Sequence, residues 1–338
     1  MSLEVDYLAS IEEANRNQWN NVVEQSDLGC VSHRYGWLRA IELGTDDEPR
    51  HLVVSKKGNP IAVFPNFVTD LGPVDQLCSI KPGFGGPIAM TDEEASIDLL
   101  LDAVSDLCDG RILFNALRTY DQNYVRYHSL LRERGYGMAV LSCRFSLDLS
   151  GGWDDVFEGM HSERRRGIRR GHDNDFDVVD EAVTERTLSS FYDEYARVMD
   201  RVEMPTLPRS FVLELASFSD RVKLFSLDVD GERRGSYLYL LDDEQSTLQH
   251  LFTAVTEEQF RYHAPELLHE HAIRWGIENG YDSYDLRGAH PDFRDGVFRF
   301  KEYFGAQTKP LLVWERGRPG PALSVLNAGR TVYRRLTA

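Results

Sequence analysis

Residues 284–305, YDLRGAHPDFRDGVFRFKEYFG, are the stretch from which the fold of this chain is inferred. Residues 283–286 predict a short strand, because Tyr and Leu alternate there with polar residues. Hydrophobic residues that recur three and four positions apart predict a helix over 293–304. Gly305 follows directly and predicts the end of that helix, since glycine readily adopts the left-handed conformation that terminates helices.

Three polar residues of this stretch are candidates for binding or catalysis. Asp285 and Arg287 lie at the end of the predicted strand, and strand ends in open α/β sheets face the crevice where ligands bind. Lys301 lies on the following helix and is one of only six lysines in the chain. Its compact ammonium suits an anionic or carbonyl group at close range. The alternative is a salt bridge from Lys301 to Asp285 or Glu302.

The rest of the second half predicts a regular series of elements around this stretch. Asp230-Gly231 joins two of its strands and indicates a hairpin turn. The predicted strands cover 177–180, 222–229, 234–241, 246–255, 283–286 and 310–315. The predicted helices cover 153–159, 161–171, 188–202, 209–218, 265–279, 293–304 and 321–336.

The first half predicts a similar series, with helices at 11–24, 35–43, 93–107 and 123–134 and strands at 51–55, 61–68, 111–117 and 138–149. Ser150-Gly151-Gly152 interrupts the pattern and predicts a boundary between a domain at 1–149 and one at 150–338. The predicted fold class is α/β, of the α+β kind. It consists of two tandem domains, each a mixed, mainly antiparallel sheet flanked by helices.

The amino-acid composition says more about the salt content of the protein's surroundings than about the reaction that it catalyses. The chain of 338 residues has a formal net charge of −17, and only six of its 38 basic residues are lysine, which leaves 32 arginines. An acidic, lysine-poor surface is typical of halophilic proteins, in which concentrated salt screens the repulsion. An ordinary acidic enzyme is the alternative. The charge argues against duplex DNA as a partner, because duplex binders need a basic face.

Cysteine usage and hydropathy indicate an intracellular protein. Cys30, Cys78, Cys108 and Cys143 are widely spaced and have no companion histidine spacing, so we expect neither a disulfide framework nor a metal site. The first residues lack a signal-peptide pattern, and no stretch approaches the roughly 20 apolar residues of a membrane span. We therefore expect a cytoplasmic protein without a membrane span.

Two motifs resemble the Fem-like branch of the GNAT acyltransferases. Residues 284–288 (YDLRG), followed by 296–305 (GVFRFKEYFG), resemble the signature of that branch, which includes the aminoacyltransferases that build peptidoglycan cross-bridges. Residues 164–171 (RRRGIRRG) resemble the basic helix that precedes its second domain, and residues 32–37 (SHRYGW) resemble the start of its fold. The resemblance implies twin GNAT-like domains and an acyl-transfer reaction.

The resemblance and the residues together suggest which side chains act as the base and which contact the substrate. Amide formation needs a base for the attacking amine, and Asp285, His250 and His290 are the candidates. Tyr239, which shares a strand face with Tyr237, is a candidate substrate contact, although core packing also explains both.

Arg166 and Arg169 belong to a crowded basic helix that could recognise phosphate, pyrophosphate or tRNA. Pairing with the protein's own Asp173, Asp175 and Asp177 is the alternative. The loop at 81–87 (KPGFGGP) could hold an anion or a sugar, or it could be a structural turn.

The sequence indicates the acyl donor less clearly than it indicates the acceptor. GNAT enzymes that use acyl-coenzyme A normally carry a [QR]-x-x-G-x-[GA] loop whose N–H groups cradle the pyrophosphate. The corresponding residues here are 259–264, where Gln259, Arg261 and Ala264 are the candidate cofactor contacts and Tyr262 replaces the glycine. We expect no tightly bound cofactor. Acyl-CoA or aminoacyl-tRNA remains a candidate co-substrate.

Three functions follow from these observations. The first is an N-acyltransferase that moves an acyl or aminoacyl group onto an amine of a phosphorylated or nucleotide-linked acceptor, such as an amino sugar of a surface-glycan precursor. The second is an acetyl-CoA-dependent N-acetyltransferase that acts on a small amine or a protein. The third is a non-catalytic binding module that retains the twin GNAT frame.

Overall fold

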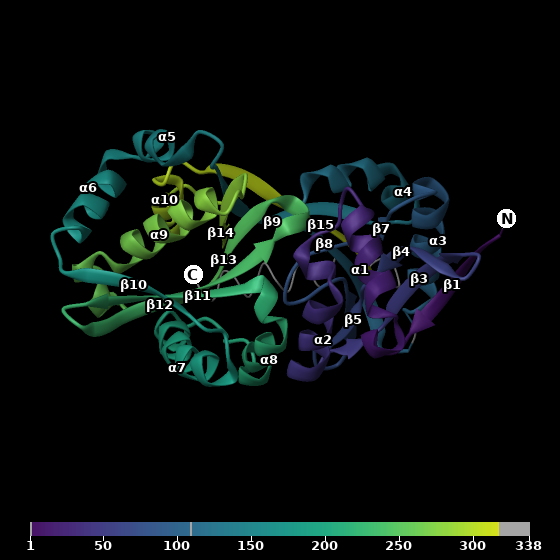
Figure 1. Cartoon of the computed structure of the whole chain (residues 1–338). Coiled ribbons are helices and arrows are strands. Elements are labelled where there is room, and N and C mark those ends of the chain that lie inside the picture. The colour runs from purple at the N-terminus through teal and green to yellow at the C-terminus, as the bar shows by residue number, and fades with distance from the viewer. Residues whose placement is uncertain (1, 109, 318–338) are drawn as a thin grey trace. The chain divides into compact units, whose positions relative to one another are not determined.

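The computed structural model describes residues 2–108 and 110–317. The helix predicted at 321–336 lies outside these residues. Within them the chain forms two compact units, whose elements are labelled in Figure 1.

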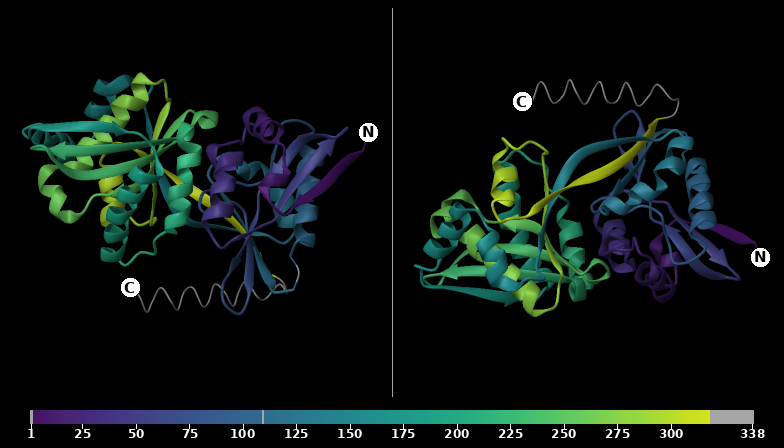
Figure 2. Two further views of the ribbon diagram at one scale, coloured as in Figure 1. Left: turned by 60° about the horizontal axis from the view of Figure 1, so that its bottom comes forward. Right: turned by 90° about the horizontal axis from the view of Figure 1, so that it is seen from above.

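The chain passes between the units through two long strands. β9 (Gly137–Asp148) begins in the first unit and ends in the second, and β15 (Gln307–Gly317) runs the opposite way (Figure 2). The first unit comprises 2–42, 46–141 and 311–317 of the described residues, and the second comprises 43–45 and 142–310. Most of the last strand therefore belongs to the first unit.

The first unit contains a four-stranded antiparallel sheet in the order β1-β3-β4-β7. Its other strands follow the order β15-β8-β6-β5-β2, in which only β6 and β8 are parallel. The strands are β1 (Leu3–Leu8), β2 (Glu48–Pro49), β3 (His51–Lys56), β4 (Asn59–Phe64), β5 (Phe67–Asp70), β6 (Asp75–Cys78), β7 (Ile88–Ala89) and β8 (Ile112–Thr119). The helices are α1 (Arg16–Gln25), α2 (Tyr35–Gly44), α3 (Glu93–Asp106) and α4 (His128–Glu133).

Two local features of the first unit differ from prediction. The helix expected at 11–24 is a short 3-10 turn followed by α1, because the Asn15 side chain accepts hydrogen bonds from the first N–H groups of α1 and caps it there. The strand expected at 61–68 is divided into β4 and β5. Pro65 lies at the break and has no N–H to donate to a sheet.

The second unit contains a sheet in the order β10-β11-β12-β13-β14-β9. Its neighbours are antiparallel except β13 and β14, which are parallel. The strands are β10 (Phe176–Glu181), β11 (Val222–Val229), β12 (Glu232–Asp242), β13 (Thr247–Ala254) and β14 (Ser283–Ala289). The helices are α5 (Gly152–Gly159), α6 (Ser162–Gly171), α7 (Glu185–Arg201), α8 (Arg209–Glu214), α9 (Ala264–Glu278) and α10 (Gly296–Glu302). The predicted mixed, mainly antiparallel α+β class is confirmed.

Helices cover both faces of this sheet. In Figure 1, α5, α6, α9 and α10 lie on one side and α7 and α8 on the other. The alternation along β12 explains this arrangement, because Tyr237, Tyr239 and Leu241 join the buried cluster that contains the α9 residues Leu267 and Leu268. The intervening side chains face α7.

Helix α10 is shorter than the helix predicted at 293–304. The carboxylate of Asp295 accepts a hydrogen bond of 2.9 Å from the backbone N–H of Phe298 and starts the helix at Gly296. Gly305 follows the helix with φ +82°, as predicted for a terminating glycine. A Cβ at Gly305 would lie 2.9 Å from the carbonyl oxygen of Gly159, so the glycine also permits a close approach to α5.

We expect Gly305→Ala to lower the free energy of unfolding by about 2–3 kcal/mol, through the left-handed conformation and the contact with Gly159. Gly280→Ala is the matched control. Gly280 also has a positive φ, of +78°, but a Cβ there would meet nothing within 4 Å. The control should cost about 1 kcal/mol. Chemical denaturation of both variants measures the difference, and equal losses would show that the contact with Gly159 is unimportant.

Candidate active site

The two parallel strands of the second unit pair over only three residues each. Residues 247–249 of β13 pair with residues 283–285 of β14, although both strands continue further. The pairing of β14 with β9 is also irregular between Asp285 and Gly288, where Arg287 has φ +63°. β14 therefore bulges just beyond Asp285 and leaves β13. Bulges of this kind are common beside active sites, where they redirect side chains.

Asp285 fixes this bulge. Its side chain is completely buried, and one carboxylate oxygen accepts a hydrogen bond of 2.9 Å from the Arg144 guanidinium on β9. The other oxygen accepts from the backbone N–H of Arg287. A buried carboxylate held by an arginine and a backbone N–H is a rigid structural anchor. This environment favours a positioning role for Asp285 over the role of base for which the sequence proposed it.

Arg287 ties the bulge to the neighbouring strands. Its guanidinium donates to the Gln249 side-chain oxygen at 2.7 Å, and the Gln249 amide donates to Asp242 at 2.7 Å. Gln249 and Asp242 are both buried. The predicted substrate contact Arg287 thus lies at the strand divergence, half-buried, with one edge of its guanidinium already engaged by the protein.

Lys301 reaches the same bulge from α10. Its ammonium donates to the carbonyl oxygen of Gly288 at 2.6 Å. Among the residues that the structure describes, it forms no salt bridge, so the alternative of a salt bridge with Asp285 or Glu302 is not realised. Burial lowers the pKa of Lys301 to about 8, although the negative charge of Asp285 partly opposes the shift. The group is therefore an ammonium at neutral pH, with a lone pair accessible at modest cost.

Aromatic side chains and two histidines fill the space between the sheet and α9. The His250 ring lies 4.4 Å from the Tyr237 ring and 5.0 Å from the His269 ring, measured between centroids. Burial lowers the pKa of His250 well below its usual value, and the neighbouring His269, Lys301 and Arg287 lower it further. His250 is therefore neutral at physiological pH and could accept a proton. Its Nε2 lies 3.1 Å from the Thr253 hydroxyl.

Tyr239 has a structural environment. It is completely buried, and its hydroxyl donates to the carbonyl oxygen of Leu268 on α9 at 3.2 Å. This contact agrees with the packing explanation of the tyrosine pair and leaves less room for a direct substrate contact. His290, by contrast, is exposed just after β14.

The glycines of α6 lie on its buried face, and most of its arginines lie on its exposed faces. Gly167, Ile168 and Gly171 are buried against α9, where a Cβ at Gly167 would lie 3.0 Å from Glu266. Arg164 also turns inward, donating to Glu266 at 2.6 Å. This close approach leaves the remaining arginines on the outer faces of the helix.

The outer arginines are not neutralised by the protein. Arg166, Arg169 and Arg170 are exposed and Arg165 is half-exposed. Within residues 2–108 and 110–317, none of them has a hydrogen-bond or ion-pair partner through its side chain, and Arg169 only lies over the Phe157 ring at 5.3 Å. The expected alternative of pairing with Asp173, Asp175 and Asp177 is therefore wrong. An acidic protein keeps a cationic face on this helix.

The polar side chains of the loop at 259–264 form hydrogen bonds with neighbouring residues in the sequence. The Gln259 side-chain oxygen accepts from the backbone N–H and hydroxyl of Thr256 in a capping box. Arg261 donates to the Tyr262 hydroxyl at 2.7 Å and lies over its ring, which Arg234 also approaches at 4.6 Å. Ala264 is buried at the first position of α9. Tyr262, held between two guanidinium groups, thus takes the place of the small glycine expected in a coenzyme A loop.

In the first unit, the segment 32–37 contacts the loop at 81–87. The Trp37 indole donates to the carbonyl oxygen of Pro82 at 3.0 Å, and the His33 Nε2 lies 3.1 Å from the carbonyl oxygen of Gly86. The other His33 nitrogen lies 3.1 Å from the Cys30 sulfur. Burial lowers the pKa of His33 to about 4, so the ring is neutral and acts as a clamp on the loop at 81–87.

Sequence reasoning missed Arg144, Gln249 and His269. Arg144 and Gln249 are buried polar residues on strands. Alternation along a strand does not say which of its two faces is buried, so it could not show that these side chains lie inside. His269 lies on the apolar face of a predicted helix, with its Nδ1 2.5 Å from the Tyr284 hydroxyl. The signal in the sequence that could have identified His269 is the presence of a polar side chain on an otherwise apolar helix face.

The described residues contain no cluster of His, Cys, Asp and Glu arranged to hold a metal ion. None of the helices in the same residues is both long and apolar enough to span a membrane.

Comparison with known proteins finds a family model that matches part of the chain and solved structures with a similar fold. Residues 160–302 match the family model described as an acetyltransferase (GNAT) domain. The crystal structure of FemX is similar over 91% of this chain and 96% of its own, with a TM-score of 0.71 and 11% identity. The C-terminal domain of a putative lysylphosphatidylglycerol synthetase from Agrobacterium fabrum has a TM-score of 0.59 and 16% identity, covering 95% and 96%. No curated protein matches the sequence significantly.

A tandem GNAT protein from the clavulanic acid biosynthesis pathway is also similar, with a TM-score of 0.55 and 12% identity over 94% of this chain and 98% of its own. Residues 160–302 therefore match a GNAT domain, which supports an acyltransferase. The fold is similar to those of FemX and of the tandem GNAT protein, in agreement with the fold that the sequence motifs predicted.

We expect His269 to make the protein sensitive to acid. Burial lowers the pKa of His269 from 6.5 to about 3, so the unfolded chain binds a proton between these values that the folded chain does not. Stability is therefore complete above pH 6.5 and declines as the pH falls toward 3. His269→Gln should reduce that decline by up to about 1.4 kcal/mol per pH unit. Urea denaturation between pH 4.5 and 7 measures it.

His290→Gln, which changes an exposed histidine, is the control and should leave the dependence of stability on pH unaltered. An unchanged dependence in His269→Gln would mean that His269 is protonated in the folded protein.

Proposed function

We propose that the protein transfers an acyl or aminoacyl group to an amine of a phosphorylated or nucleotide-linked acceptor, such as an amino sugar of a surface-glycan precursor. The observation that carries the acceptor class is the unpaired arginine face of α6. Four guanidinium groups have no carboxylate partner within the described part of a chain of net charge −17, and such a cluster suits an anionic group that arrives from solution.

The reaction itself is assigned to the divergence of β13 and β14. The attacking amine must lose a proton, and the carbonyl oxygen of the acyl group becomes negatively charged in the transition state. In the proposed mechanism neutral His250 accepts the proton as the amine attacks, and the Lys301 ammonium stabilises that oxygen. When the intermediate collapses, the bond between the acyl group and its carrier breaks, and the departing oxygen or sulfur of the carrier takes the proton from His250. Asp285 and Arg287 hold the bulge whose Gly288 carbonyl positions Lys301.

The donor in this proposal is a charged tRNA or another acyl carrier that does not depend on a glycine-rich pyrophosphate loop. The support is the loop at 259–264, where Gln259 and Arg261 are engaged by neighbouring residues and Tyr262 occupies the position of the glycine. Acetyl-CoA-dependent N-acetylation is the second candidate. It is favoured by the match of residues 160–302 to an acetyltransferase family model.

Turnover assays with nucleotide-linked amino sugars test the acceptor class, with charged tRNA and acetyl-CoA as alternative donors. We expect the double variant Arg166→Gln, Arg169→Gln to raise the KM for the phosphorylated acceptor about tenfold while kcat changes little, because charge-assisted contacts to phosphate are lost. The KM of an unphosphorylated analogue should not change.

Arg197→Gln is the matched control, because Arg197 is an exposed arginine on α7. A double variant with the KM of the unaltered protein would remove the argument for a phosphorylated acceptor. Absence of turnover with every donor would leave the binding module as the better description.

We expect Lys301→Met to lower kcat about 10²- to 10³-fold without lowering the melting temperature, because it removes charge from the developing oxyanion. In the unaltered protein the ammonium is lost as the pH rises through about 8, so kcat should fall above that pH. Lys301→Arg should retain part of the activity and lose this alkaline decline. A pH–rate profile measures both effects, and a fully active Lys301→Met would exclude the assigned role.

A further inference from the structure

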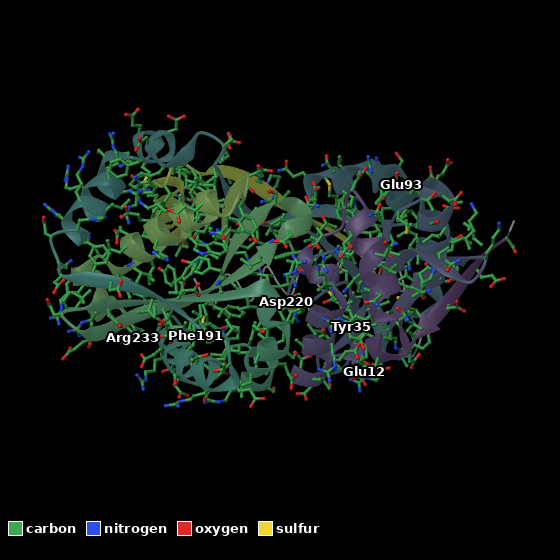
Figure 3. All side chains as sticks on the ribbon, viewed as in Figure 1. Glu12, Tyr35, Glu93, Phe191, Asp220 and Arg233 are labelled. Atoms are coloured by element: carbon green, nitrogen blue, oxygen red, sulfur yellow. The ribbon has the colours of Figure 1, made fainter. Side chains whose placement is uncertain are left out.

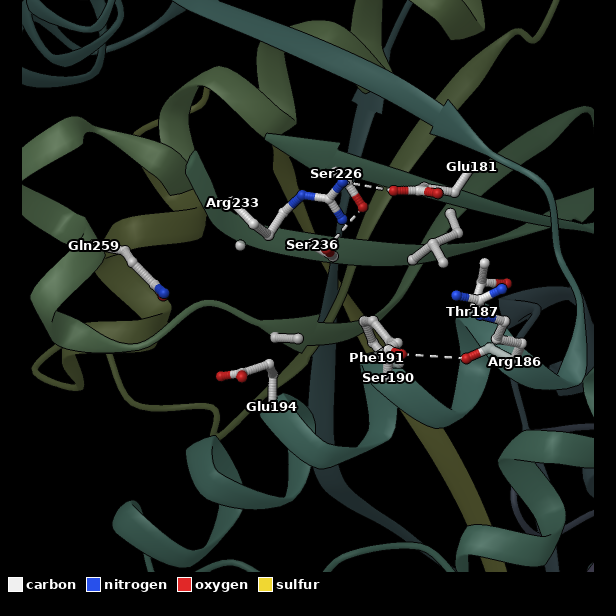
Figure 4. A pocket seen from close by; sticks show the side chains of 13 residues that line it. Glu181, Arg186, Thr187, Ser190, Phe191, Glu194, Ser226, Arg233, Ser236 and Gln259 are labelled. Carbon is white, nitrogen blue, oxygen red and sulfur yellow. Dashed lines mark hydrogen bonds and ion pairs between the residues drawn. The ribbon is translucent and has the colours of Figure 1, made fainter. Parts of the chain in front are cut away.

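A cavity lies on the face of the same sheet that α7 covers. It has a volume of about 370 Å³ and lies between α7 and the strands β11 and β12, opposite the face that carries His250 and His269 (Figure 4). We name it the serine pocket, after Ser226 and Ser236 at its floor. Sites for small molecules commonly have volumes of about 300–1,000 Å³.

The pocket exists because small side chains occupy one row of the sheet. Ser226 of β11 is opposite Ser236 of β12, which is opposite Ala254 of β13. Larger side chains surround this row. Leu224 lies on the same face of β11, and Phe191 of α7 covers the row from above. Figure 3 labels Phe191 and Arg233, which line the pocket from the helix and from the sheet.

The floor retains hydrogen-bonding capacity. The Ser226 and Ser236 hydroxyls are 2.8 Å apart and buried. One of their two protons serves this mutual bond, and the described part of the chain offers no acceptor for the other. Gln259 at the rim uses its side-chain oxygen in the capping box, so its amide N–H groups remain available. Buried donors without acceptors are costly, and a ligand oxygen would satisfy them.

One guanidinium of the pocket lining has no carboxylate partner among the described residues. Arg233 is paired with Glu181 at 2.7 Å and with Asp228, and Glu194 is paired with Arg197 at 2.6 Å. Arg186, at the start of α7, has no hydrogen-bond or ion-pair partner for its guanidinium among residues 2–108 and 110–317. A ligand carboxylate would pair with this guanidinium.

We propose that the serine pocket binds a small hydroxylated carboxylate, of the size and class of a sugar acid. Its carboxylate pairs with Arg186, and its hydroxyl oxygens accept from Gln259 and from the serine pair. Phe191 covers one apolar face of the ring. This site is separated by the sheet from the acyl-transfer site, so it serves recognition or regulation and takes no part in the chemical step.

Calorimetric titration of the full chain tests the proposal, with glucuronate as the probe and glucose and acetate as comparison ligands. We expect saturable binding of glucuronate with a Kd of about 1 mM or below. Glucose lacks the carboxylate and acetate lacks the hydroxyls, so both should bind at least about tenfold more weakly. Equal binding of glucose and glucuronate, or no saturable binding of glucuronate, would overturn the proposal.

Variants locate the site. Arg186→Gln and Ser226→Ala should each weaken glucuronate binding about tenfold, whereas Ser236→Leu should abolish it by filling the floor. Arg274→Gln, an exposed arginine on α9 at the other face, is the matched control and should bind normally. Thermal melting confirms that each variant is folded. Binding that survives both Arg186→Gln and Ser226→Ala would place the ligand elsewhere and refute the assignment.

Because these titrations need neither an acyl donor nor turnover, their result is independent of the proposed transferase reaction. Lys301→Met should bind glucuronate as the unaltered protein does. Loss of binding in that variant would contradict the separation of the two sites.

Discussion

The buried carboxylate of Asp285 is the constraint on which the candidate active site depends. It accepts hydrogen bonds from Arg144 on one neighbouring strand and from the backbone of Arg287 two residues ahead. These bonds hold β14 in a bulge at the point where its parallel pairing with β13 ends. Without them a left-handed conformation at Arg287 would be unfavourable, since a Cβ disfavours positive φ. The carbonyl that receives Lys301 would then have no fixed position.

Helix α6 shows how an acidic chain retains a cationic surface. Glycines on one face allow α6 to approach α9 closely, and a single inward arginine, Arg164, is neutralised by Glu266. The same helical period directs the other arginines outward, where no carboxylate of the described residues pairs with them. Like charges on adjacent turns repel one another, so such a cluster is unfavourable unless a ligand or salt compensates it. That cost supports a role in binding for these arginines.

The two faces of the second unit's sheet differ in chemistry because strand side chains alternate. On one face, aromatic rings and neutral histidines fill the space under α9 and depress the pKa values of the histidines and of Lys301. On the other face, a row of serine and alanine leaves a hollow beneath α7. One sheet thus has a face of buried aromatic and histidine side chains and a face with a hollow lined by hydroxyl groups.

The sequence by itself determined the order and type of most elements, the resemblance to the Fem-like GNAT branch, and the identity of Asp285, Arg287 and Lys301 as neighbours. Local rules suffice for these, because periodicity, turn residues and a helix-ending glycine act over a few residues. Helix boundaries such as Gly296 depended on which side chain capped them. Only the tertiary structure decided that Asp285 anchors a bulge, that Lys301 bonds a carbonyl instead of a carboxylate, and that the outer arginines of α6 have no partner among the described residues. Each of these outcomes depends on partners more than ten residues away in the chain, such as Arg144, Gly288 and Glu266, and no local pattern specifies their distance.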